Sequence, residues 1–128
     1  MTNYLTVEQV IQINKEVLLE IKVKKADSFK VLSVLKLGKV LESMEKEGKD
    51  VFDKAVALLK GLTQEHPFAS GNRRTALVAV LKFLELNSHS IQLDFNPRTL
   101  QGIRESYYSD KEIKDWLIGG DIREFKRK

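Results

Sequence analysis

The 128-residue sequence contains no cysteine, only two prolines and a single tryptophan. Without cysteine, neither a disulfide framework nor a thiolate metal site can form. Long hydrophobic runs are also missing, because the most apolar stretch, residues 75–86, is too short to span a bilayer. We find no signal peptide, internal repeat, low-complexity segment or domain linker. We therefore expect one cytoplasmic domain, residues 1–128, with no membrane partner.

The sequence also has only a small excess of positive over negative charge. The 22 Lys and Arg residues are scattered among 18 Asp and Glu residues, which gives a formal net charge of +4. The one basic run is the tail, residues 126–128. A nucleic-acid-binding surface usually concentrates its basic residues on one face or in one helix. This pattern favours solvated charges over a nucleic-acid interface.

Hydrophobic periodicity predicts an all-α fold of five to seven helices. Thr6, Asp50 and Ser109 are good helix N-caps, and a capping-box partner follows Thr6 at Gln9. We expect the second helix to loosen at Gly38 and to stop at Gly48. The segment 88–95 alternates apolar and polar residues, so a short extended piece is expected there. The helices are predicted at residues 6–21, 29–44, 50–65, 72–87, 97–107 and 110–118.

The other helices are expected to pack around residues 72–87. From Thr75 to Leu86 this helix is apolar on nearly every side, interrupted only by Lys82 and Glu85. A helix with this composition belongs in the centre of a domain. The polar loop that precedes it, residues 66–74, is therefore held at the end of a buried helix.

The loop 66–74 has the residues of an anion site. A helix N-terminus presents unpaired backbone N–H groups and partial positive charge, and Gly71 would let a ligand approach the main chain. The guanidiniums of Arg73 and Arg74 match phosphate oxygens, and the amide of Asn72 can donate. His66 can accept a proton near neutral pH. These groups indicate transfer of a phosphate-containing group.

The pattern His66-Pro67-Phe68-x-x-Gly71-Asn72-x-Arg74-Thr75-Ala76-Leu77 resembles the signature of the Fic/Doc family. Residues 83–87 resemble the continuation found in its short Doc (death on curing) branch. Arg73 and Leu77 also point to this branch, because AMP-transferring Fic proteins usually carry glycine and arginine at these two positions. The resemblance implies a Fic/Doc-like helical bundle around the central helix.

Two positions depart from the family. One is Arg73, which stands where Doc-like proteins usually have lysine, and the other is Ser70. An aspartate or glutamate usually stands where this chain has Ser70, and that carboxylate holds the magnesium that bridges nucleotide phosphates. A neutral hydroxyl is a poor substitute for a carboxylate as a magnesium ligand. The resemblance therefore implies ATP as a substrate and leaves magnesium binding at Ser70 open.

As the resemblance implies, the leading hypothesis is a toxin of a toxin–antitoxin pair. It would transfer a phosphoryl group from ATP to a hydroxyl of a translation elongation factor, and an antitoxin protein would neutralise it. His66 would be the base and Arg74 the second catalytic residue, while Ser70, Gly71, Asn72, Arg73 and Arg74 would bind phosphate. The alternatives are AMP transfer to a protein hydroxyl and a degenerate, non-catalytic protein-binding module.

Several residues also have simpler interpretations. Ser70 or Asn72 could be an N-cap of the central helix, and Arg74 could pair with Glu65. The pattern Ser43-x-x-x-Glu47-Gly48 resembles an inhibitory motif of some Fic proteins, although an ordinary helix end is favoured. His89 is expected at the surface. Trp116, Tyr107 and Tyr108 are expected in packing.

Overall fold

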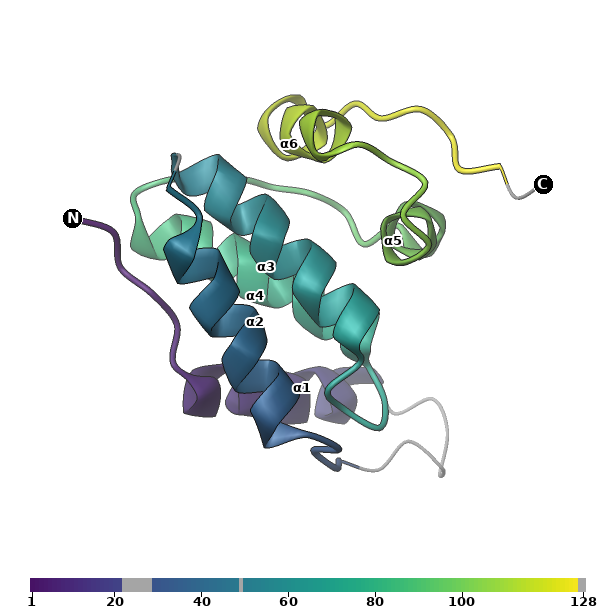
Figure 1. Ribbon diagram of the computed structural model, residues 1–128. Coiled ribbons are helices and arrows are strands. Elements are labelled where there is room, and N and C mark those ends of the chain that lie inside the picture. Colours follow the sequence, from purple (N-terminus) through teal and green to yellow (C-terminus); the bar gives the residue numbers. More distant parts are fainter. Residues whose placement is uncertain (22–28, 49, 127–128) are drawn as a thin grey trace.

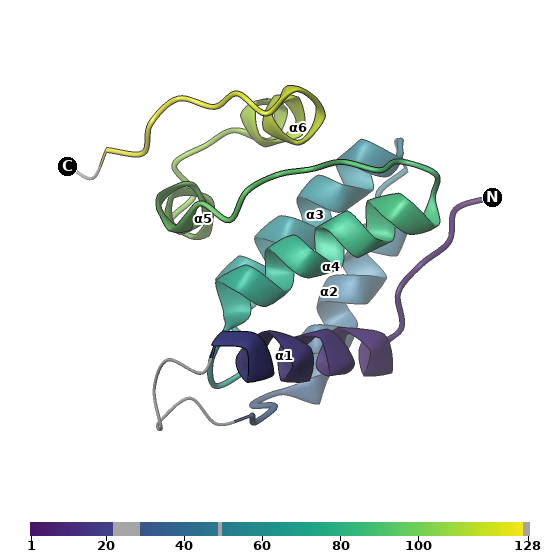
Figure 2. The same ribbon diagram turned by 180° about the vertical axis from the view of Figure 1, so that it is seen from behind.

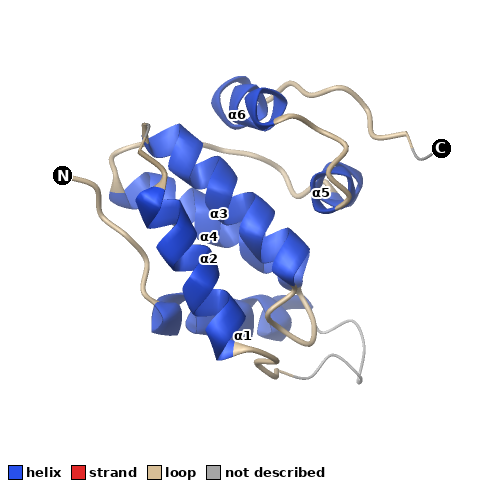
Figure 3. Cartoon of the chain, in the orientation of Figure 1, coloured by secondary structure: helices blue, strands red, loops and turns tan. Residues whose placement is uncertain are grey.

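The structure is a computed structural model that describes residues 1–21, 29–48 and 50–126. The predicted charged connection 22–27 lies outside the described residues. The described chain is all-α, as predicted, and contains no strand (Figures 1 and 3). None of its helices is long and apolar enough to cross a membrane. The helices are α1 (Val7–Ile21), α2 (Val34–Lys46), α3 (Val51–Glu65), α4 (Asn72–Leu86), α5 (Pro97–Arg104) and α6 (Asp110–Gly119).

The predicted N-caps are confirmed at three helices. Thr6 and Gln9 form a reciprocal capping box at α1, in which Thr6 Oγ1 accepts from Gln9 N–H at 3.1 Å. Asp50 caps α3, and Ser109 caps α6 together with Glu112. Each cap satisfies backbone donors that have no partner inside the helix, so these residues set where the helices begin.

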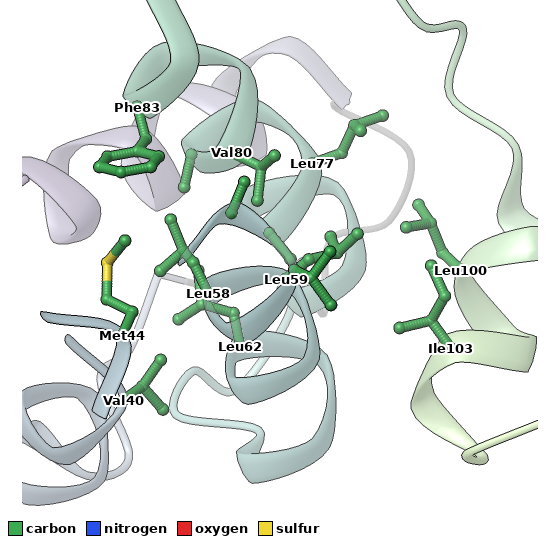
Figure 4. Close-up of a cluster of buried hydrophobic side chains, with 14 of the residues drawn as sticks. Val40, Met44, Leu58, Leu59, Leu62, Leu77, Val80, Phe83, Leu100 and Ile103 are labelled. Carbon is green, nitrogen blue, oxygen red and sulfur yellow. The ribbon is translucent and has the colours of Figure 1, made fainter. Parts of the chain in front are cut away.

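Helix α4 lies in the centre of the bundle, as the sequence predicts. It packs along α3, while α2 covers the other side of α3 and α1 crosses α4 (Figures 1 and 2). Helices α5 and α6 pack mainly against α3. Figure 4 shows side chains of α2, α3, α4 and α5 in one apolar core. Its buried members include Leu58, Leu59, Leu62, Leu77, Val80, Phe83, Leu100 and Ile103.

The start of α2 differs from the prediction. The helix begins at Val34 rather than at residue 29, because Ser33 caps it and accepts from Lys36 N–H. Residues 29–33 instead pair with the loop after α3: Leu32 N–H donates to Pro67 C=O at 2.8 Å, and Ala69 N–H donates to Lys30 C=O at 2.9 Å. Tertiary hydrogen bonds therefore replace the predicted first helical turn.

Other predicted boundaries are also corrected. Helix α2 continues through Gly38 without the expected loosening. It ends at Lys46 with Glu47 as its C-cap, directly before Gly48, which agrees with the predicted stop. Helix α5 ends at Arg104, so Tyr107 lies beyond it, after a positive φ of 60° at Ser106. The expected extended piece at 88–95 contains no helix, and within the described part of the chain it pairs with no strand.

Candidate phosphate-binding site

The loop between α3 and α4 is shaped by two left-handed residues. His66 ends α3 with φ 55°, and Gly71 begins α4 as its N-cap with φ 75°. The alternative that Ser70 or Asn72 caps the helix is wrong, because Gly71 occupies that position and has no side chain to offer. The N-cap residue therefore engages none of the first backbone N–H groups of α4 with a side chain, and such groups can bind an anion.

The amide of Asn72 fixes the loop from inside. Its Oδ1 accepts from Phe68 N–H at 3.0 Å, and its Nδ2 donates to Phe68 C=O at 2.8 Å. Asn72 and Phe68 are both buried. The sequence prediction gave this amide a direct role towards phosphate, whereas the structure engages it with the loop backbone. Asn72 thereby positions the first turn of α4.

Helix α1 supports the loop from the other side through Asn14. This buried side chain donates from Nδ2 to Ser70 C=O at 2.9 Å and to Thr75 Oγ1 at 3.0 Å. A Cβ on Gly71 would lie 3.2 Å from Leu18 Cδ2, so close packing on α1 adds to the need for glycine. Asn14 was not predicted from the sequence. Its signal was a polar residue on the otherwise apolar face of Val10 and Val17.

The loop forms one side of a pocket of about 340 Å³. Residues 66 and 69–74 line it together with Phe95 and Arg104, which come from beyond α4. All predicted site residues therefore meet in one place. Three arginines and a histidine line the pocket, and none of its described lining residues is an aspartate or glutamate. This composition suits a multiply charged anion.

The three guanidiniums are held in different ways. Arg74 stacks on the ring of Phe95, and Arg73 donates from Nη1 to Gln101 Oε1 on α5. The alternative pairing of Arg74 with Glu65 is not seen, because among the described residues the Arg74 guanidinium makes no ion pair. Arg104, at the end of α5, was not singled out in the sequence analysis. The position of Arg104 in a short helix gave no indication in the sequence that its side chain would reach the pocket.

His66 lines the pocket, and its surroundings favour the neutral imidazole. Partial burial and the positive charges of Arg104, Arg73 and Lys36 lower the pKa of His66 below its ordinary value of 6.5. Burial is the largest of these causes. A lowered pKa keeps the imidazole neutral at cellular pH, so a ring nitrogen can accept a proton.

The donor set does not fit the magnesium ion that the family resemblance implies. Magnesium prefers carboxylate oxygens together with substrate phosphates. Ser70 supplies a hydroxyl at the expected position, and no other described residue lining the pocket supplies a carboxylate. In the described part of the chain, no group of three or more His, Asp or Glu side chains could hold a metal ion.

The other residues singled out in the sequence lie away from this pocket. Glu47 lines a separate hollow with Asp53, Lys60 and Asp110, so its place is that of an ordinary helix end. His89 is exposed, as predicted, with its ring 4.9 Å from that of Phe52. Trp116 and Tyr108 are buried in packing, also as predicted.

A helical bundle with this loop at the head of its central helix is the arrangement of the Fic/DOC family, whose profile matches residues 4–84. Since the match covers more than half of the chain, the protein belongs to that family. Among curated proteins the chain is similar to "Toxin Doc" of Mycolicibacterium smegmatis (strain ATCC 700084 / mc(2)155), with 41% identity over 46 residues. The matched region is 36% of this chain and 35% of that protein.

Proposed function

We propose that this protein transfers the γ-phosphoryl group of ATP to a hydroxyl of a protein. The observation that carries the proposal is the pocket at the start of α4, where three guanidiniums and an imidazole meet without a neighbouring acid among its described lining residues. Phosphoryl transfer depends mainly on positioning and on stabilising charge, which these groups supply. The name of the relative supports a toxin of a toxin–antitoxin pair.

In this mechanism, the hydroxyl oxygen of the target attacks the γ-phosphorus. The bond from the γ-phosphorus to the bridging oxygen breaks, and ADP leaves. A ring nitrogen of His66 takes the hydroxyl proton. Arg73, Arg74 and the backbone N–H groups of the first turn of α4 bind the phosphate oxygens, while Asn72 and Asn14 hold that turn in place.

Labelled ATP tests the transferred group. We expect label from γ-labelled ATP, and none from α-labelled ATP, to appear on a translation elongation factor in a cytoplasmic extract. Arg74→Ala should lose most of this transfer, and His66→Ala should lose it while still binding ATP. Full transfer by Arg74→Ala would contradict the assignment. Label from α-labelled ATP would instead establish AMP transfer, the nearer alternative.

The chain's place in a toxin–antitoxin pair is tested by growth. Expression of the wild-type protein should arrest bacterial growth, and His66→Ala should not. Co-expression of the protein encoded beside it should restore growth and yield a complex with the wild-type chain. Equal arrest by His66→Ala would show that toxicity does not require the proposed base.

A second candidate is a non-catalytic protein-binding module. The observation in its favour is Ser70, which removes the carboxylate expected of a magnesium-dependent member of the family. This candidate predicts no saturable ATP binding, whether magnesium is present or chelated. Calorimetric titration of the purified protein with ATP separates the two proposals.

A further inference from the structure

Arg104 is the one guanidinium at the pocket that has no described partner. It is the last residue of α5 and exposed, and its side chain lines the pocket with His66 and Arg73. Among the described residues it makes no hydrogen bond or ion pair, whereas Arg73 bonds Gln101 and Arg74 stacks on Phe95. It also lies beyond residues 4–84, which the family profile covers.

We propose that this pocket binds the triphosphate of ATP without a divalent cation, and that Arg104 supplies the positive charge that magnesium would otherwise supply. This inference rests on the proposed function. It follows from two observations on the same site: carboxylates are absent from its described lining residues, and a third guanidinium faces it from α5. A polyphosphate needs its charge neutralised, and guanidiniums bind its oxygens directly.

A simpler explanation accounts for only part of this arrangement. An arginine in the last turn of a helix is stabilised there by the partial negative charge of the helix C-terminus. That effect explains a cation at the end of α5, but not why its side chain lies at a pocket that already contains Arg73, Arg74 and His66. Like charges repel, so the cluster is favourable only when an anion joins it.

The electrostatics at His66 agree with this placement. Of the neighbouring charges that lower its pKa, Arg104 has the largest effect, ahead of Arg73 and Lys36. Arg104 therefore acts on the same space in which the base and the phosphates would meet.

The test is calorimetric titration of the full chain with ATP, in excess EDTA and in excess magnesium chloride. We expect the wild-type protein to bind ATP in EDTA at least as tightly as in magnesium. Arg104→Gln should weaken binding in EDTA about tenfold or more, as the loss of a charge-assisted phosphate contact predicts, and Arg104→Lys should recover part of it.

Arg98→Gln is the matched control. Arg98 also lies on α5 and its replacement removes the same charge, but its guanidinium faces Phe125 and Glu124, away from the pocket. We expect Arg98→Gln to bind ATP as the wild type does. An equal loss in both variants would mean that only net charge matters, and would overturn the proposal.

The remaining outcomes separate this inference from the function on which it rests. Binding that requires magnesium and disappears in EDTA overturns the metal-free site and leaves nucleotide transfer standing. Wild-type ATP affinity in Arg104→Gln overturns the role of Arg104. No binding under either condition overturns both this inference and the proposed function.

Discussion

The guanidinium carbon of Arg74 lies 3.8 Å from the centroid of the Phe95 ring. Arg74 is in the first turn of α4, and Phe95 lies just before α5, so the stack joins the motif loop to the segment opposite. The ring covers one face of the guanidinium and leaves its N–H groups for other partners. Phe95 therefore orients the Arg74 side chain, for which we propose a phosphate-binding role.

This stack predicts the behaviour of variants at Phe95. A cation–π contact contributes about 0.5–2 kcal/mol, so Phe95→Leu should weaken ATP binding by roughly twofold to thirtyfold. Phe95→Tyr retains an aromatic face and should bind as the wild type does. Calorimetric titration provides the affinities. Unchanged ATP affinity in Phe95→Leu would show that the stack does not orient Arg74 for ATP binding.

A second prediction concerns Asn14 and the stability of the loop. Asn14→Ala should lower the free energy of unfolding by about 1–3 kcal/mol, because Ser70 C=O and Thr75 Oγ1 lose a buried donor. Gln12→Ala, at an exposed position of the same helix, should change it by less than about 0.5 kcal/mol. Urea denaturation followed by circular dichroism measures both. Equal effects of the two variants would contradict a supporting role for Asn14.

Two glycines should respond in opposite directions to alanine. Gly71→Ala should destabilise the protein by about 1–2 kcal/mol, because φ is 75° and the new Cβ would lie 3.2 Å from Leu18 Cδ2. Gly38→Ala should stabilise it by about 0.5–1 kcal/mol, since it lies inside α2 with nothing within 4 Å. The midpoints of urea denaturation show whether each variant is more or less stable than the wild type. A stabilising effect of Gly71→Ala would contradict a strained backbone at this turn.

A fourth prediction concerns the pH dependence of His66. Its pKa in the folded protein is lowered, so the neutral base persists below pH 6.5 and the acidic limb of the transfer rate should lie below that value. Removing positive charge in Arg104→Gln should raise this pKa, whereas Arg98→Gln should not. Titration of the His66 ring by proton NMR measures it directly. An unchanged pKa in Arg104→Gln would place Arg104 away from the base.

The lowered pKa of His66 also makes the free energy of unfolding depend on pH. Because the pKa is lower in the folded state, protonation of His66 favours the unfolded chain. Its contribution to the free energy of unfolding is therefore complete above about pH 6.5 and falls as the pH drops towards the folded pKa. His66→Gln should flatten the dependence of urea midpoints on pH in this window.

Local signals in the sequence predicted most of the helices. Thr6, Asp50 and Ser109 mark helix starts because a cap acts on the backbone only three residues away. The start of α2 was misplaced although Ser33 was a suitable cap. Residues 29–32 are apolar enough to resemble a helical turn, and their hydrogen bonds go to Pro67 and Ala69, more than thirty residues along the chain.

For the site, too, only the residues that form a local pattern could be predicted from the sequence. Residues 66–74 carry a recognisable pattern in a single continuous segment. Phe95 and Arg104 could not be assigned, because each reaches the pocket only through the packing of its own helix or loop, and the contacts of Asn14 with Ser70 and Thr75 likewise depend on how α1 packs on α4. The engagement of the Asn72 amide with Phe68 also depends on the loop conformation, which the residue types do not specify.

The two walls of the pocket are encoded separately. One wall is the motif within residues 4–84, and the other is formed by Phe95 and Arg104, outside that region. Substitutions at Phe95 or Arg104 would change the second wall and leave the motif intact. A match to the family profile therefore reports on the first wall of the pocket and carries no information about the second.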